Sequence, residues 1–128
     1  MTAMAHGAPM ADQLLASSSD GIMAFDAQFR LLFWNATMEK IWGLAASDVL
    51  GQRVLDLFPF LVTSGDDHLM GAALAGHETV SSDQPFTLSG SGRHGFYEGR
   101  YRPLRDEIGH IVGGIGVIRD ISLSKQAE

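Results

Sequence analysis

Histidine and cysteine side chains are common metal ligands, and both serve as acid–base or nucleophilic groups in enzymes. The chain has no cysteine, which excludes thiolate nucleophiles, zinc–cysteine sites, disulfides and a cysteine-linked flavin. No two of its five histidines have the i, i+4 spacing or the accompanying carboxylates of a metal site: His6, His68, His77, His94 and His110. The sequence therefore predicts no metal site made by the protein alone.

Other catalytic arrangements are also missing from the sequence. No Ser-His-Asp spacing or pair of acids in a recognisable frame occurs, and the glycine run at 113–116 falls within a predicted strand. A small cone-shaped enzyme of the isomerase type would need a carboxylate facing its cavity. The strand positions that we expect to face inward offer none: Tyr97, Gly99, Tyr101, Ile115 and Val117. We therefore expect a sensory or interaction module, with the isomerase as the alternative from the enzyme class.

Four of the nine basic residues fall within 13 positions: Arg93, Arg100, Arg102 and Arg105. Paired guanidinium donors could bind a carboxylate or a phosphate. Two of these arginines alternate with the tyrosines of the same strand, so they are expected on the opposite face. The alternation favours a face covered by solvent or by a partner, and an anionic ligand is the lesser alternative.

Composition bounds the class of protein. A chain of 128 residues with 45% hydrophobic and 19% charged residues fits one globular domain. Its net charge of -6 disfavours nucleic acid and anionic membrane surfaces as partners. No apolar run approaches the ~20 residues that span a bilayer, and no secretory signal is recognisable. We expect a cytoplasmic segment without membrane contact.

Hydrophobic periodicity and turn residues predict the elements that position these side chains. Residues 1–13 are expected to form a flexible leader and the start of a flanking helix that continues to Ser18. A β-hairpin is predicted from the runs at 22–25 and 29–34, and Asn35 can cap a following helix that Gly43 ends. Short helical pieces are then predicted near 47–50 and 54–58, before a helix at about 66–75 that begins with a capping box at Ser64.

Three strands complete the chain, at about 79–88, 96–104 and 111–121, with turn-forming residues at 89–92 and 106–109. A hairpin and a three-stranded meander separated by short helices indicate an α+β fold. Its antiparallel sheet would carry the helices on one face.

Several motifs resemble those of the PAS domain, in the variety common in bacterial sensor kinases. They are Ser19-Asp20-Gly21-Ile22, Trp34-Asn35 leading to Ile41-Trp42-Gly43, Val49-Leu50-Gly51 with Leu57-Phe58-Pro59, Tyr101-Arg102-Pro103-Leu104-Arg105-Asp106, and the closing Arg119-Asp120-Ile121-Ser122. The resemblance covers about residues 14–128. It implies a PAS domain at 14–122 with a five-stranded antiparallel sheet, short helices on one face and an N-terminal flanking helix that often builds a dimer interface.

The resemblance also implies a cavity between the sheet and the helices, in which members of the family bind a ligand. The apolar helical stripes must bury against the same sheet face, so their residues are candidates to line it: Met38, Ile41, Trp42, Leu69 and Ala73. Tyr97, Gly99 and Tyr101, with Ile115 and Val117, are the strand candidates, and Gly99 would leave a gap for a ligand or for another backbone. The strand glycines at 113–116 would instead let the N-terminal helix pack on the outer face of the sheet.

No particular cofactor is implied. Some PAS domains bind haem through a histidine on the helix where His68 is expected, which makes His68 a candidate axial ligand. Without cysteine, the light-sensing flavin chemistry of the family is excluded.

The resemblance places the output at the C-terminus. Asp120, Ile121 and Ser122 are expected to relay a conformational change, with Asp120 holding the end of the strand and Ser122 capping a helix that opens at Leu123. Residues 123–128 are expected to begin a signalling helix toward an effector outside this chain. The expected function is the input or dimerisation domain of a signal-transduction protein such as a sensor histidine kinase. Alternatives are a homodimerisation module without a ligand and a haem-binding gas or redox sensor.

Overall fold

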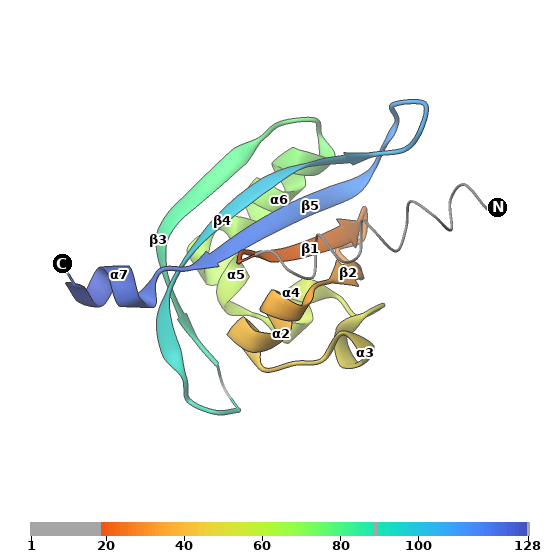
Figure 1. The fold of residues 1–128 in the computed structure, drawn as a ribbon. Coiled ribbons are helices and arrows are strands. Elements are labelled where there is room, and N and C mark those ends of the chain that lie inside the picture. The colour runs from red at the N-terminus through yellow and green to blue at the C-terminus, as the bar shows by residue number, and fades with distance from the viewer. Residues whose placement is uncertain (1–18, 89, 128) are drawn as a thin grey trace.

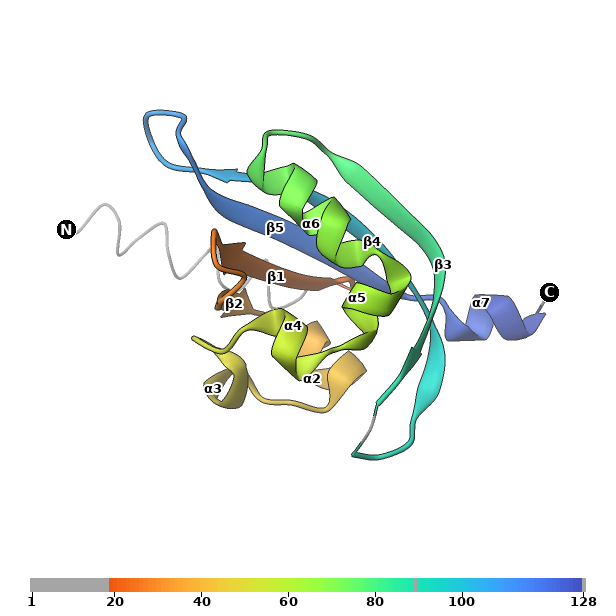
Figure 2. The ribbon, with the colours of Figure 1, turned by 180° about the vertical axis from the view of Figure 1, so that it is seen from behind.

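The computed structural model describes residues 19–88 and 90–127. One layer is a five-stranded antiparallel sheet, and the other consists of short helices on one of its faces (Figures 1 and 2). The strand order is β2-β1-β5-β4-β3, so the last strand lies at the centre. The strands are β1 (Gly21–Asp26), β2 (Leu31–Trp34), β3 (Thr79–Thr87), β4 (His94–Arg105) and β5 (Ile111–Asp120). The predicted α+β fold, with its antiparallel sheet, is confirmed.

Five short helices connect β2 to β3 and cover the inner face of the sheet (Figure 2). They are α2 (Ala36–Trp42), α3 (Ala46–Val49), α4 (Val54–Leu57), α5 (Phe60–Ser64) and α6 (Asp66–Leu74). A last helix, α7 (Ser122–Ala127), follows β5 and extends beyond the sheet (Figure 1). Among the described residues, no helix is long and apolar enough to cross a membrane. The N-terminal flanking helix predicted up to Ser18 lies outside the described residues.

Asn35 joins the first hairpin to the helical layer. Its side-chain oxygen accepts hydrogen bonds from the backbone N–H of Met38, in the first turn of α2, and of Ile22, in β1, both at 3.0 Å. Its side-chain N–H donates to the Asp20 carbonyl at 3.2 Å. Gly43 ends the helix with φ of 73°, a conformation that costs glycine little. The predicted start and end of this helix are thus confirmed.

The next helices begin differently from the prediction. Helix α3 starts at Ala46, whose N–H is bound by the carboxylate of Glu39 at 2.7 Å, and Ser47 lies inside the helix. Ser64 is the last residue of α5, and the left-handed Gly65 is the residue that precedes α6. Gly65 has no side chain to cap α6, and the Ser64 hydroxyl accepts from the N–H of Asp66 at 3.3 Å, not from that of Asp67. The predicted capping box between Ser64 and Asp67 is therefore wrong.

The central strand β5 packs closely against its neighbours through glycine. Gly116 lies opposite Met23 of β1 and Tyr101 of β4. A Cβ atom at Gly116 would lie 2.9 Å from the Met23 methyl carbon and 3.2 Å from the Tyr101 ring. This glycine therefore makes room for core side chains on the inner face. The N-terminal helix that was expected to pack on the outer face lies outside the described residues.

Candidate functional site

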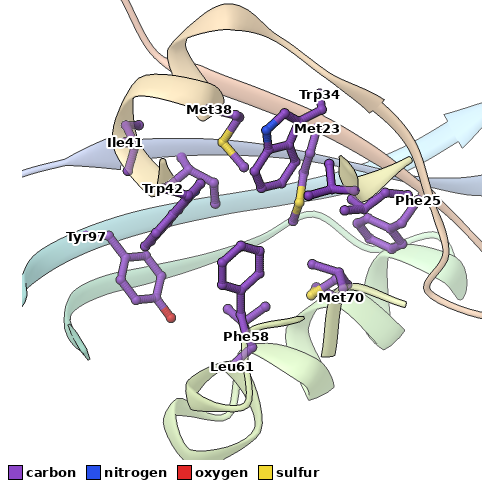
Figure 3. Packing of buried hydrophobic residues seen from close by; sticks show 14 of the residues in the cluster. Met23, Phe25, Trp34, Met38, Ile41, Trp42, Phe58, Leu61, Met70 and Tyr97 are labelled. Atoms are coloured by element: carbon purple, nitrogen blue, oxygen red, sulfur yellow. The ribbon is translucent and has the colours of Figure 1, made fainter. Parts of the chain in front are cut away.

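The interior between the sheet and the helices is filled by aromatic side chains (Figure 3). The ring of Trp42 lies with its centroid 5.0 Å from that of Phe86 and 5.3 Å from that of Phe58. It also contacts Phe60 and Tyr97, at 5.6 and 6.1 Å. A cavity of about 10 Å³ remains between these rings, with room for about one water molecule. In this conformation the interior is a packed core.

The helical residues predicted to line a cavity lie on the inner side of the molecule. Met38 and Trp42 border the small cavity, whereas Ile41 and Ala73 are buried in the core around it. Leu69 is half-buried and packs against the edge of the core. These helical residues therefore pack against the sheet as predicted, but most of their surface contacts other core side chains and does not line a cavity.

Of the strand candidates, Tyr97, Gly99 and Tyr101 share the inner face and are buried. Tyr97 borders the cavity. The space beside Gly99 is occupied, because a Cβ atom there would lie 2.7 Å from the Tyr101 hydroxyl and 3.2 Å from a carboxylate oxygen of Asp66. The gap left by Gly99 is thus filled by this chain's own polar side chains.

Ile115 and Val117 lie on the outer face of the sheet, which corrects the expectation that they point inward. They are paired with Arg102 and Arg100, the exposed residues that alternate with the tyrosines of β4. Partners directly across a strand pair point to the same side of the sheet. The inner positions of β5 are instead Gly114, Gly116 and Ile118, so neither Ile115 nor Val117 borders the interior cavity.

A buried carboxylate, that of Asp66, lies beneath the two tyrosines. Its side chain is 0% exposed and accepts hydrogen bonds from Tyr101 at 2.5 Å, Ser81 at 2.8 Å and Ser64 at 3.0 Å. The Ser64 hydroxyl also lies 3.1 Å from the hydroxyl of Tyr97. This Asp66 cluster joins α5 and α6 to β3 and β4, and its donors replace the water that a buried carboxylate loses.

The cluster holds both tyrosines in their neutral form. Burial raises the pKa of Tyr97 and of Tyr101 well above the ordinary value near 10, and the negative charge of Asp66 raises both further. For Tyr97, the hydrogen bond with Ser64 acts in the opposite direction. The phenols therefore serve as hydrogen-bonding groups at neutral pH.

Sequence reasoning missed Asp66, although a signal was present. Asp66, Met70 and Ala73 are spaced i, i+4 and i+7, so they share one face of α6, and all three are buried. An acid in step with an apolar stripe was the clue to a buried carboxylate.

The residues present do not fit haem. His68 is exposed on α6, on the opposite side of the helix from the buried Asp66 and Met70, and the interior cavity of about 10 Å³ is far smaller than a porphyrin. No cluster of three His, Asp or Glu side chains suited to a metal ion occurs among the described residues.

Arg93 lies between β3 and β4, and its side chain joins three elements near the C-terminal end of β5. Its guanidinium pairs with the carboxylate of Asp120 at 2.8 Å and donates to the backbone carbonyl of Ile41, in the last turn of α2. The guanidinium also lies 5.7 Å from the centre of the Phe86 ring, within the range of a cation–π contact. In the sequence, only its clustering with Arg100, Arg102 and Arg105 set Arg93 apart.

The residues after β5 tie α7 to the sheet. Asp120 accepts a hydrogen bond from the Ser122 N–H at 2.9 Å, so its carboxylate caps the start of α7. The Ser122 hydroxyl instead accepts from the Phe96 N–H at 3.1 Å, and the Ile121 N–H donates to the Phe96 carbonyl at 3.0 Å. The helix begins at Ser122, not at Leu123, and the capping role expected of Ser122 belongs to Asp120.

Comparisons with known proteins agree with this geometry. A family model described as PAS fold matches residues 15–126. The methanogenesis regulatory histidine kinase FilI of Methanothrix harundinacea is 29% identical over 114 residues, which are 89% of this chain and 13% of that kinase. The chain therefore corresponds to about one-eighth of that relative's length.

Two of the solved structures that share the fold illustrate the similarity. The PAS domain of a Colwellia psychrerythraea protein superposes with a TM-score of 0.75 at 21% identity, over 91% of this chain and 98% of that one. The VqmA dimer of Vibrio cholerae, a LuxR-type receptor, gives a TM-score of 0.73 at 18% identity, over 91% of this chain and 52% of the other. The sheet order, the helical layer and the match over residues 15–126 show that the chain belongs to the PAS family.

Proposed function

We propose that the chain is a sensory module of a signal-transduction protein such as a sensor histidine kinase. In this proposal, a change in the packing of α2 passes through Arg93 and Asp120 to α7 and from there to an effector. The similarity to FilI supports the class of protein, because that relative is a regulatory histidine kinase.

The contacts of Arg93 are the observation that carries the proposal. One guanidinium binds the end of α2 through the Ile41 carbonyl and the end of β5 through the Asp120 carboxylate. The same carboxylate caps α7 through the Ser122 N–H. A shift of α2 would therefore move the guanidinium of Arg93, which is paired with Asp120. Asp120 in turn caps the first turn of α7, so the shift would reach that helix.

Hydrogen exchange measured residue by residue tests the relay in this chain. Arg93→Met should remove both contacts while keeping an unbranched side chain over Phe86, and we expect faster exchange in residues 122–127. Arg100→Met is the matched control, because Arg100 is exposed on the outer face of the same strand region and pairs only loosely with Glu98, at 3.5 Å. Equal exchange of α7 in both variants would refute the relay.

Regulation in the longer protein supplies the second measurement. Asp120→Ala should uncouple the input from the output without unfolding the domain, since Asp120 lies at the end of β5 and outside the aromatic core. Unchanged regulation in a folded variant would contradict the proposal.

A dimerisation module without a ligand is the second candidate, and the packed interior favours it. With a cavity of about 10 Å³, the present conformation offers no space for a small molecule in the core. The outer sheet face offers a surface for a second copy, because Val80 and Val117 lie on either side of Arg100 there. Val117→Glu should abolish a homodimer in sedimentation equilibrium, and a monomeric native chain would reject this candidate.

A further inference from the structure

We propose that a surface groove beside the aromatic core binds a small, neutral, planar ring that carries a hydrogen-bond acceptor. The groove has a volume of about 330 Å³ and lies between the end of α2, the α4–α5 junction and the β3–β4 loop. This inference rests on the proposed sensory function, for which it names the ligand class and the place of entry.

The walls of the groove favour a flat apolar ligand. Its larger side chains are aromatic or aliphatic: Trp42, Leu44, Leu57, Phe58, Phe60 and Leu88. None of the described residues that line it is charged at neutral pH. A charged ligand would lose its hydration without gaining an ion pair, whereas a neutral ring would gain aromatic contacts.

Trp42 supplies a hydrogen-bond donor without a partner. No hydrogen bond joins its indole N–H to any described residue, although its side chain is only 6% exposed. The indole N–H of Trp34, by contrast, donates to the Leu44 carbonyl at 3.0 Å. The indole N–H of Trp42 is not among the fully buried polar atoms that lack a partner, so it retains contact with solvent. An acceptor on a bound ring can replace that solvent.

The position of the groove connects it with the relay. Trp42, Phe58 and Phe60 separate the groove from the interior cavity and border both. A ring bound in the groove would press on the indole of Trp42. The preceding residue, Ile41, presents its carbonyl to Arg93, so a displacement of Trp42 would reach the Arg93–Asp120 pair through one peptide unit.

Two probes of similar size separate the contribution of the aromatic ring from that of the hydrogen-bond acceptor. Acetophenone is a neutral ring with a carbonyl acceptor, and ethylbenzene has the same ring without an acceptor. The chain has two tryptophans, so a proton–nitrogen NMR spectrum resolves the indole N–H of Trp42 from that of Trp34. We expect acetophenone to shift the Trp42 signal, to leave the Trp34 signal in place and to bind about threefold to tenfold tighter than ethylbenzene.

Three variants locate the binding. Trp42→Phe should keep the ring contact and abolish the preference for acetophenone. Leu88→Glu should place a carboxylate in the groove and weaken acetophenone binding by about tenfold or more. Val62→Glu, which changes an exposed residue of α5 outside the groove, should leave binding unchanged, and it controls for the added charge.

The outcomes are decisive even if Trp42→Phe fails to fold, because Leu88→Glu and the native chain give independent readouts. The proposed binding in the groove would be overturned by any of three results. These are an unshifted Trp42 N–H signal, equal affinity for the two probes, and equal binding of acetophenone to the Leu88→Glu and Val62→Glu variants. The exchange experiment on Arg93→Met contains no probe. Loss of ligand binding in the groove with an intact relay is therefore distinguishable from loss of the relay with intact ligand binding.

Discussion

The phenol of Tyr101 donates a hydrogen bond to the carboxylate of Asp66 over 2.5 Å, and neither side chain is more than 1% exposed. The bond crosses the interface between the two layers, since Asp66 opens α6 and Tyr101 lies in β4. Ser81 donates to the same carboxylate from β3. One buried charge thus fixes the first turn of α6 on two adjacent strands, beside a core that is otherwise apolar.

Removal of this charge should destabilise the fold strongly. Asp66→Ala leaves the buried hydroxyls of Ser81 and Tyr101 without their acceptor, whereas Ser64 keeps the Leu61 carbonyl. We expect a loss of about 2–4 kcal/mol in the free energy of unfolding. Asp67→Ala is the matched control, because Asp67 is the next residue and one of its carboxylate oxygens is buried without a hydrogen-bond partner. Denaturant unfolding of both variants measures the difference, and equal losses would contradict a special role for Asp66.

The two tyrosines should make the stability of the fold decrease at alkaline pH. Each has a pKa in the folded state above its unfolded value near 10, so the folded state holds protons that the unfolded state releases. Their contribution to stability is fully present below pH 10 and is lost as the pH rises from 10 toward the folded-state pKa values. Since the chain has two tyrosines in all, tyrosinate absorbance reports on this pair alone. We expect that absorbance to appear together with the loss of secondary structure in circular dichroism, and tyrosinate formation near pH 10 in a folded chain would contradict the burial.

Local signals in the sequence were sufficient for the hairpin and for the helix that follows it. Asn35 and Gly43 act on their own neighbours, through a side-chain cap and a left-handed backbone, so their residue types specify the local structure. The start of α3 depends instead on Glu39, seven residues before Ala46. A contact over that distance leaves no pattern in the residues at the start of the helix.

The pattern of apolar residues along β5 does not show which side of the strand is buried. Its inner positions include Gly114 and Gly116, which have no side chain to produce a hydrophobic signal, whereas the outer positions are Ile115 and Val117. The partner strands explain this inversion, because Gly116 lies opposite the large side chains of Met23 and Tyr101. Only the register between strands identifies which face is buried.

A methyl group at Gly99 should conflict with the Asp66 cluster. The Cβ atom of Gly99→Ala would lie 2.7 Å from the Tyr101 hydroxyl, so we expect a loss of about 1–3 kcal/mol in the free energy of unfolding. Tyr101→Phe removes that oxygen, and the double variant should therefore be more stable than the sum of the two single losses predicts. A double-mutant cycle from denaturant unfolding measures this coupling, and additive losses would show that the hydroxyl is not the obstacle.

Gly95 offers a way to release α7 by a substitution outside the aromatic core. A Cβ atom at Gly95 would overlap the Ser122 hydroxyl and approach the Phe86 ring to 3.1 Å. Gly95→Ala should therefore displace Ser122 from the Phe96 backbone and increase hydrogen exchange in residues 122–127, with a loss of about 1 kcal/mol or less in global stability.

Ser122→Ala separates the steric effect from the loss of the hydrogen bond. This variant removes the hydroxyl that accepts from the Phe96 N–H, but it keeps the cap that Asp120 provides, so we expect a smaller increase in exchange than in Gly95→Ala. In the double variant, the alanine at position 95 no longer meets an oxygen, and exchange should return to the level of Ser122→Ala. If the double variant exchanges as fast as Gly95→Ala, the methyl group acts through Phe86, and α7 is held mainly by the packing of that ring.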